Sequence, residues 1–268
     1  MTYDPETYWS YVGQEIQKRA DDNVIAGDDN PYYAYKRSKF LRRFLDTIDF
    51  RSKTIMEVGF GPGGNLRHIV THHRPASILG ADISQTMYDI AQRNLRSYGN
   101  VRLAKIDGSH LPFDSRSVDL SFTVTVLQHV TDATMLKALV SDICRVTRDT
   151  IVVMEDIGHH QLLDAEGSYI NRTVDAYKDL FAEHGFQLRD VQFLNTKVSR
   201  HWYEFAWRVY RRIFARDHHE GDPINLLGKL LIKLPLIVTR FLDDLLTENQ
   251  NLAKLTFIRN SPISSLGI

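Results

Sequence analysis

Strand-like and helix-like segments alternate through the middle of the sequence, and this pattern limits the fold more than any other feature. Short apolar runs rich in β-branched residues indicate five strands, at residues 54–58, 77–81, 101–106, 118–124 and 150–155. Apolar residues recur with a helical period between them, at residues 65–72, 84–98 and 132–146. Strands that alternate with helices predict a parallel sheet with right-handed crossovers and helices on both faces. We therefore expect a doubly wound α/β fold, which binds ligands at the carboxyl ends of its strands.

Composition and charge narrow the class of protein. The chain has 268 residues, of which 43% are hydrophobic and 25% charged, so we expect one large globular domain with additions. Its 33 basic and 33 acidic side chains balance, and we expect no nucleic-acid partner held by long-range attraction. The single Cys144 excludes an internal disulfide and a multi-cysteine metal site. The sequence has no secretion signal and no long apolar stretch, which predicts a cytoplasmic protein.

A glycine-rich run follows the first expected strand and precedes a helix. It reads Gly59-Phe60-Gly61-Pro62-Gly63-Gly64. Glycine lets the backbone take a positive φ and approach a ligand closely, and a helix N-terminus offers N–H groups to an anion. The run satisfies the GxGxG pattern and, through Gly59, Gly61 and Gly64, also the GxGxxG pattern of dinucleotide-binding proteins. By itself it leaves two cofactor classes open.

Acidic residues in or directly after the first three strands separate these two cofactor classes. Asp82 ends the second strand about twenty residues after the glycines, where its two oxygens suit the ribose hydroxyls of an adenosine. Its alternative duty is to cap the helix that begins near Ser84. Glu57 lies in the first strand, where a carboxylate suits the ammonium of a methionine and repels a pyrophosphate. Asp107, after the third strand, suits an adenine amino group. These acids favour S-adenosylmethionine over a nicotinamide dinucleotide.

Taken in order, these stretches resemble the motifs of class I S-adenosylmethionine-dependent methyltransferases, particularly the small-molecule branch that contains the ubiquinone and menaquinone enzymes. The resemblance spans about residues 50–196 and includes Leu127-Gln128-His129-Val130, where the family often has Leu-His-His-Val. It implies a Rossmann-like, seven-stranded, mostly parallel sheet and S-adenosylmethionine as cofactor. No Asn/Asp-Pro-Pro-Tyr/Phe sequence follows the fourth strand, which argues against methylation of an exocyclic nucleobase nitrogen.

The resemblance also implies a role for each matching residue. Asp82 would hold the ribose hydroxyls, and the carbonyl of Thr123 would accept from the cofactor ammonium. The methionine portion would be lined by three glycines with an acid beneath them, namely Gly59, Gly61, Gly63 and Glu57. The adenine would be bounded by residues after the second and third strands, namely Ile83, Met87, Asp107 and Gly108.

Methyl transfer to a hydroxyl needs a group that removes a proton, in addition to residues that align the reactants. His129, after the fourth strand, and His159 or His160, after the fifth, are the candidate bases because imidazole titrates near neutral pH. Packing or capping is the alternative role of each. Adjacent histidines on one segment point in different directions, so we expect no metal site.

The end of the sequence departs from the usual plan of this class, in which a short connection joins strands six and seven. Here strand six is expected at residues 186–195 and strand seven at 255–259, with a long helical stretch between them. Basic and aromatic residues recur in that stretch, including Trp202 and Arg208. We expect it to cover the substrate, with core packing, peripheral membrane contact and homodimer formation as alternatives.

The expected domain plan therefore has four parts: an N-terminal helical cap (1–50), the cofactor-binding core (51–199), a helical substrate-cap insert (200–250), and the last strand with a tail (251–268). The N-terminal cap supplies Tyr33 as a further candidate substrate contact. We expect methylation of a small molecule, at a hydroxyl of a sugar or natural-product intermediate. The alternatives are nitrogen or carbon methylation, nicotinamide-dependent oxidoreduction, and a non-catalytic adenosine-binding scaffold.

Overall fold

The computed structural model describes residues 3–18, 31–214, 226–246 and 251–260. The chain is divided into two compact units, each built from separate stretches of sequence. The first, called here the core unit, comprises residues 1–23, 49–192 and 252–268. The second, called the helical unit, comprises residues 24–48 and 193–251. The chain therefore leaves the core unit and returns to it twice.

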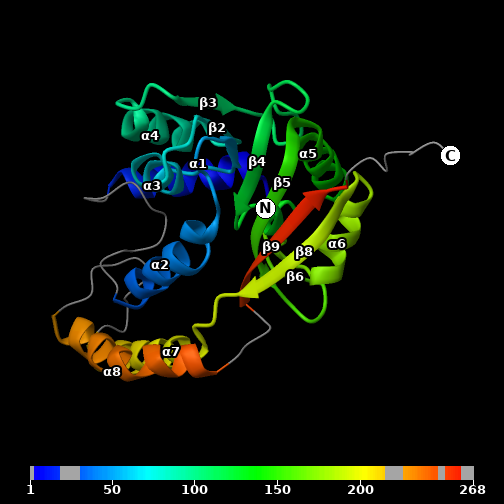
Figure 1. Ribbon diagram of the computed structural model, residues 1–268. Coiled ribbons are helices and arrows are strands. Elements are labelled where there is room, and N and C mark those ends of the chain that lie inside the picture. Colours follow the sequence, from blue (N-terminus) through cyan, green and yellow to red (C-terminus); the bar gives the residue numbers. More distant parts are fainter. Residues whose placement is uncertain (1–2, 19–30, 215–225, 247–250, 261–268) are drawn as a thin grey trace. The chain divides into compact units, whose positions relative to one another are not determined.

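A seven-stranded sheet forms the centre of the core unit (Figure 1). Its strands are β1 (Thr54–Val58), β2 (Ser77–Asp82), β3 (Val101–Lys105), β4 (Val118–Val124), β5 (Thr147–Ile157), β8 (Phe186–Phe193) and β9 (Asn251–Arg259). They lie in the order β3-β2-β1-β4-β5-β9-β8. The first five are paired in parallel, whereas Figure 1 shows β8 and β9 running in opposite directions. The doubly wound, mostly parallel sheet expected from the sequence is therefore confirmed.

Helices and one small hairpin complete the core unit. The helices are α1 (Pro5–Gln17), α3 (Gly64–His72), α4 (Gln85–Leu95), the 3-10 turn η2 (Leu127–His129), α5 (Ala133–Val146) and α6 (Val174–Ala182), and the hairpin pairs β6 (Leu162–Leu163) with β7 (Ile170–Asn171). Ser84 caps α4, since its Oγ accepts from the N–H of Met87, so the capping role considered for Asp82 belongs to Ser84. Four of the five residues of β1 are buried, as expected for a strand covered on both faces.

The N-terminal segment, expected to form one cap over residues 1–50, is divided between the units. α1 packs on α4, where Ile16, Met87 and Ile90 are each at most 1% exposed. The following helix, α2 (Pro31–Arg43), belongs to the helical unit. Both helices have an apolar face, but periodicity alone does not reveal which surface that face covers.

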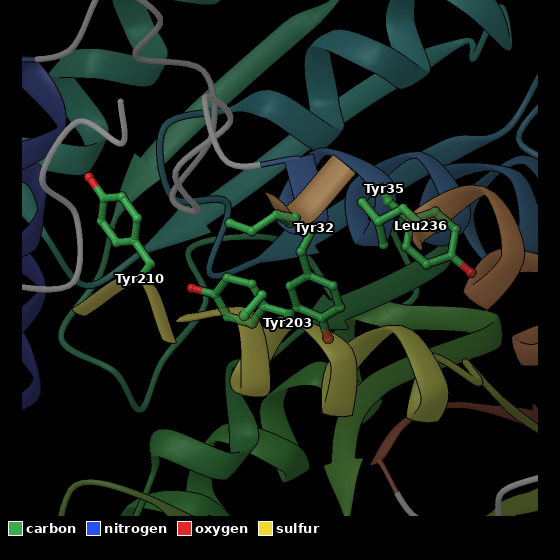
Figure 2. Close-up of a cluster of buried hydrophobic side chains, with 7 residues drawn as sticks. Tyr32, Tyr35, Tyr203, Tyr210 and Leu236 are labelled. Carbon is green, nitrogen blue, oxygen red and sulfur yellow. The ribbon is translucent and has the colours of Figure 1, made fainter. Parts of the chain in front are cut away.

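The helical unit consists of α2, the short turn η1 (Leu45–Thr47), α7 (Lys197–Phe214) and α8 (Leu226–Leu245). Its core is rich in tyrosine, and the rings of Tyr32 and Tyr203 stack with their centroids 4.7 Å apart (Figure 2). The expected insert 200–250 thus shares its core with α2 instead of standing alone. None of the described helices is long and apolar enough to cross a membrane.

A buried carboxylate on α8 fixes the start of α7. Asp243 accepts from the backbone N–H groups of Val198 and Ser199, at 2.8 and 3.2 Å, and from the hydroxyl of Tyr35 at 3.0 Å. Negative charge is favourable at a helix N-terminus because the first N–H groups have no intrahelical partner. One side chain therefore ties α2, α7 and α8 together.

Pro235 lies inside α8 and cannot donate to the carbonyl one turn earlier, that of Leu231. The indole N–H of Trp202 on α7 points to that oxygen, with Nε1 3.4 Å from it. A side chain of the neighbouring helix thus compensates for the missing backbone hydrogen bond.

Candidate functional site

The glycine run forms a tight loop between β1 and α3 at the carboxyl edge of the sheet. Gly59, Gly61 and Gly63 all have positive φ, of 73°, 53° and 87°. At Gly59 a Cβ atom would lie 2.3 Å from Cγ2 of Val126, which is in the loop after β4. Glycine is therefore required at this position by backbone conformation and by the close approach of a second loop.

Asp82, at the end of β2, is tied to the glycine loop. Its Oδ2 accepts from the N–H of Gly61 at 2.8 Å, and its Oδ1 accepts from the N–H of Ser84 at 2.9 Å. The side chain is 5% exposed, and burial raises its pKa to about 6. Each carboxylate oxygen has a second lone pair, so the group can still accept from two hydroxyls. Asp82 thus holds Gly61 and the capping residue Ser84 without itself capping α4, and this role is compatible with ligand binding.

Glu57 lies on β1 beneath the glycine loop and is fully buried. Its Oε1 accepts from the side-chain amide of Asn65, at 2.7 Å, in the first turn of α3. The register pairs Glu57 with Gly80 of β2 and with Phe122 of β4, so it stands in the middle of the sheet. The structure therefore places a carboxylate directly under the loop.

The third strand end presents an acid and a glycine. Oδ1 of Asp107 accepts from the N–H and hydroxyl of Ser109, which lowers the pKa of the carboxyl. Oδ2 has no hydrogen bond with any residue in the described part of the chain. Gly108 packs on Ile83, whose Cδ1 would be 3.0 Å from an added Cβ. Met87, predicted to flank an adenine, is 1% exposed and is covered by α1.

The loop after β4 adopts a strained conformation. Thr125 is β-branched but has a φ of +53°, a region in which such residues are rare outliers. Its N–H donates to the carbonyl of Met154 at 2.8 Å, which holds the conformation in place. The register puts Thr123 beside Val58 of β1, so its carbonyl belongs to the same sheet edge as the glycine loop and Asp82. Strain of this kind is concentrated at functional sites.

Glu155 on β5 anchors this loop. The carboxylate is fully buried and accepts from three backbone N–H groups and one hydroxyl at 3.0–3.1 Å, those of Val126, Leu127, Gln128 and Thr123. Burial raises its pKa to about 7. The guanidinium of Arg172 donates to the carbonyls of Leu127 and Val130, at 2.6 and 2.7 Å. A carboxyl group and a guanidinium therefore bind the backbone donors and acceptors of η2 and of the residues on either side of it.

His129 ends η2, and each of its two ring nitrogens has a hydrogen-bond partner. Its Nδ1 lies 3.0 Å from the carbonyl oxygen of Ser168, and its ring meets the edges of Trp9 and Tyr169. A carbonyl only accepts, so Nδ1 carries the hydrogen, and the lone pair of Nε2 accepts from the side-chain amide of Gln128 at 3.4 Å. Burial lowers the pKa of His129, which favours the neutral ring. This is the form that a general base requires.

Gln128, where the family often has histidine, is part of the scaffold of the loop. It is 3% exposed, and its Oε1 accepts from the N–H of Asp156 at 2.8 Å. His159 and His160 are exposed in the bend that follows β5. The imidazole of His129 is therefore fixed by hydrogen bonds within the protein, whereas those of His159 and His160 are exposed to solvent.

Two of the three expected substrate contacts line one cleft, within the helical unit. The cleft has a volume of roughly 670 Å³, and its lining comprises Tyr32, Tyr33, Lys36, Arg200, Tyr203, Glu204, Trp207 and Arg208. Three of these side chains are basic and one is acidic. Tyr33 and Arg208 are thus brought together, whereas Trp202 is not part of the lining and donates to Leu231.

Sequence reasoning missed Glu155, Arg172 and Asp243. Each is a buried charge that acts on backbone groups distant in sequence. The one available signal was Glu155 itself, an acid directly after the apolar run Ile151–Met154, because a buried carboxylate must be satisfied by donors. Nothing in the sequence shows where those donors come from.

Comparison with known proteins agrees with this arrangement. The methyltransferase domain family matches residues 55–150. An uncharacterized 37.1 kDa protein in transposon Tn4556 of Streptomyces fradiae is 33% identical over 90 residues, which cover 33% of this chain and 26% of that relative. The matched region thus spans about a quarter of the curated relative.

Solved structures of low identity share the fold. The [4+2]-cyclase SpnF superposes with a TM-score of 0.56 at 16% identity, over 86% of this chain and 82% of that one. Phosphoethanolamine N-methyltransferase 2 of Haemonchus contortus, solved with S-adenosylhomocysteine, gives a TM-score of 0.57 at 16% identity, over 97% and 58%. Residues 55–150 therefore match a methyltransferase domain, and the chain has the fold of these solved structures. Together the two findings support S-adenosylmethionine as the cofactor.

Proposed function

We propose that the protein transfers the methyl group of S-adenosylmethionine to a hydroxyl of an anionic small molecule, with His129 as general base. The observation that carries the proposal is the convergence of the glycine loop, Asp82 and the loop after β4 at one sheet edge. A sugar or natural-product intermediate is the acceptor class we favour. That the protein belongs to the branch with the ubiquinone and menaquinone enzymes stays a prediction.

The residues at this edge fit the chemical groups of the cofactor. Asp82 offers acceptors for the ribose diol, and the glycine loop before α3, which has no side chains at its three glycines, would lie against the methionine portion. Glu57 and the Thr123 carbonyl suit the ammonium, and Oδ2 of Asp107 suits the adenine amino group. When bound, S-adenosylmethionine supplies an electrophilic methyl group on a sulfonium.

His129 would accept the proton of the acceptor hydroxyl at Nε2, where this hydroxyl would replace the Gln128 amide as hydrogen-bond partner. Its Nδ1–H is held by the Ser168 carbonyl, which fixes the tautomer and the ring plane. Because burial lowers the pKa of His129, the ring is neutral at neutral pH and ready to take a proton. Glu155 and Arg172 would act as positioning residues, since they hold η2 and thereby the imidazole.

The cleft of the helical unit supports an anionic acceptor. Lys36 makes no hydrogen bond or ion pair with any described residue, and the only described bond of the Arg208 side chain joins Nε to the Glu204 carbonyl at 3.2 Å. The terminal nitrogens of Arg208 are thus available to a phosphate or carboxylate, which it binds in bidentate fashion. Tyr33 and Trp207 add aromatic rings to the lining of the cleft.

Nitrogen methylation is the second candidate. The Haemonchus structure was solved with phosphomonomethylethanolamine, a phosphorylated amine, and a basic cleft suits such a phosphate equally well. Because a [4+2]-cyclase shares the fold, transfer of label is a more decisive measurement than binding of cofactor.

The first test is calorimetric titration with S-adenosylhomocysteine and, as comparison, NAD. We expect binding of the first at about micromolar dissociation constant and none of the second. Labelled S-adenosylmethionine is then incubated with neutral sugars, phosphorylated and nucleotide-linked sugars, and phosphoethanolamine. Label on a phosphorylated sugar supports the proposal, label on the amine replaces it by nitrogen methylation, and binding of NAD alone overturns the cofactor assignment.

A further inference from the structure

Helix α8 exposes an unusually continuous apolar surface. Eight of its side chains are between 42% and 76% exposed, namely Leu226, Leu227, Leu230, Leu234, Ile237, Val238, Phe241 and Leu245. Half of the large exposed hydrophobic residues in the described part of the chain lie on this one helix. Folded monomers rarely expose contiguous apolar patches, and those that do use them for binding.

The geometry of the helix separates this surface from the packed one. At about 100° per residue, the eight side chains fall within an arc of roughly 120° along the whole helix. The buried residues, Gly228, Ile232, Leu236, Thr239 and Asp243, fall on the opposite side, where α8 packs against α7 and α2. The exposed side chains therefore take no part in the core of the helical unit.

Basic residues follow one edge of the apolar arc. Lys229, Lys233 and Arg240 lie between the buried face and the exposed apolar face. Arg240 stacks over the ring of Tyr35, at 4.7 Å from its centroid, and so has a fixed position at this edge. The acid on the same edge, Asp244, is paired with Lys39 at 2.8 Å.

We propose that α8 binds the surface of an anionic lipid bilayer, with its apolar arc in the acyl boundary and its basic edge at the headgroups. Helices that lie in a membrane interface combine a broad apolar face with Lys and Arg beside it. A second copy of this chain fits less well, because α8 offers no unpaired acid on this face to meet the basic edge. The inference is independent of the acceptor and of methyl transfer.

Sedimentation of the full chain with vesicles tests this proposal. Vesicles of phosphatidylcholine alone are compared with vesicles that contain about 30% phosphatidylglycerol. We expect binding to the anionic vesicles, and a loss of at least about tenfold in the partition coefficient for the double substitution Ile237→Glu, Phe241→Glu. Lys233→Gln should weaken binding to the anionic vesicles only.

The controls separate lipid binding from misfolding and from association. Leu162→Glu changes an apolar residue that is 70% exposed on β6 and should bind as the unchanged protein does. Because both substituted side chains of α8 are at least 65% exposed, circular dichroism should remain the same, and Leu234→Glu serves as a second variant. Absence of vesicle binding overturns the proposal, as does binding that these substitutions leave intact. A concentration-dependent dimer that the double substitution dissociates, without vesicle binding, assigns the surface to a second copy instead.

Discussion

Nδ1 of His129 lies 3.0 Å from the carbonyl oxygen of Ser168, which puts the lone pair of the ring on Nε2, where the amide of Gln128 lies 3.4 Å away. This relationship connects η2 to the segment before β7, and it determines which nitrogen can act in catalysis. Because the ring can act as a base only when Nε2 is unprotonated, the catalytic rate should depend on pH.

The substitution His129→Gln should lower kcat by about 100-fold or more, because general base catalysis contributes that much. In the unchanged protein, kcat/KM should rise with pH and level off below the ordinary histidine pKa of 6.5, because burial lowers the pKa of His129. Rates measured from pH 5 to 8, in about half-unit steps, check both points. The control is His72→Gln, at the end of α3, which should change neither. A loss of less than tenfold would remove His129 from the base role.

The substitution Asp82→Asn should weaken binding of S-adenosylhomocysteine by about 1–3 kcal/mol through lost charge-assisted hydrogen bonds. Since burial raises the pKa of Asp82 to about 6, protonation should weaken cofactor binding as the pH falls below that value. Calorimetry at several pH values measures both effects. Asp89→Asn, on the exposed face of α4, is the matched control. Equal affinities of the variant and the unchanged protein would contradict the ribose assignment.

Glu155 should make the protein less stable as the pH rises. Burial raises its folded-state pKa from 4.5 to about 7, so the unfolded chain releases this proton at lower pH than the folded one. The free energy of unfolding should therefore decrease between pH 4.5 and 7, by at most about 3 kcal/mol. Urea unfolding over this window, compared with Glu155→Gln, isolates the effect. Parallel pH curves for the two proteins would refute it.

The contact between Gly59 and Val126 can be tested by a double-mutant cycle. Gly59→Ala should destabilise the fold by about 2 kcal/mol or more, because alanine at this positive φ is strained and its Cβ would clash with Cγ2 of Val126. Val126→Ala removes the clash but not the strain, so it should rescue only part of the loss. Chemical unfolding of the four proteins gives the coupling energy. If the losses in unfolding free energy of the two single variants add up to that of the double variant, Val126 is not the residue with which the added Cβ at position 59 clashes.

Trp202 and Pro235 should be energetically coupled. Trp202→Phe leaves the Leu231 carbonyl without its donor, at a cost of about 1 kcal/mol. In the Pro235→Ala background the backbone N–H of residue 235 can donate to that oxygen, and the same change at Trp202 should cost less. Thermal unfolding of the four variants measures the difference. If the cost is the same in both backgrounds, Trp202 has another role, and substrate binding becomes the first candidate.

The sheet could be predicted because its information is local. Each of the first five strands is specified by an apolar run of five to seven residues, and the turns after the first three strands are specified by the glycines and acids that follow directly. The positions of β1 and β4 agree with the predicted ranges, and β5 extends further at both ends, from Thr147 to Ile157. The glycine loop and Asp82 followed from the same local signals.

The charges that hold η2 and α7 could not be predicted, because their partners are distant in sequence. Glu155 acts on backbone groups 27–29 residues away, Arg172 on carbonyls 42 and 45 residues away, and Asp243 on N–H groups 44 and 45 residues away. Such contacts exist only after the fold has formed. The same reason explains why α2 and the 200–250 segment, separate in the predicted plan, share one core.

The strand order β5-β9-β8 has a consequence for synthesis of the chain. β8 borders the sheet only through β9, yet residues 186–193 leave the ribosome before residues 251–259, with all of α7 and α8 between them. During translation β8 has no strand to pair with, and the edge of β5 that β9 will occupy stays open. A nascent chain in this interval leaves open the two strand edges that β9 will later pair, one on β5 and one on β8, a condition that promotes association between chains. The last strand therefore completes the sheet by closing both edges in a single step.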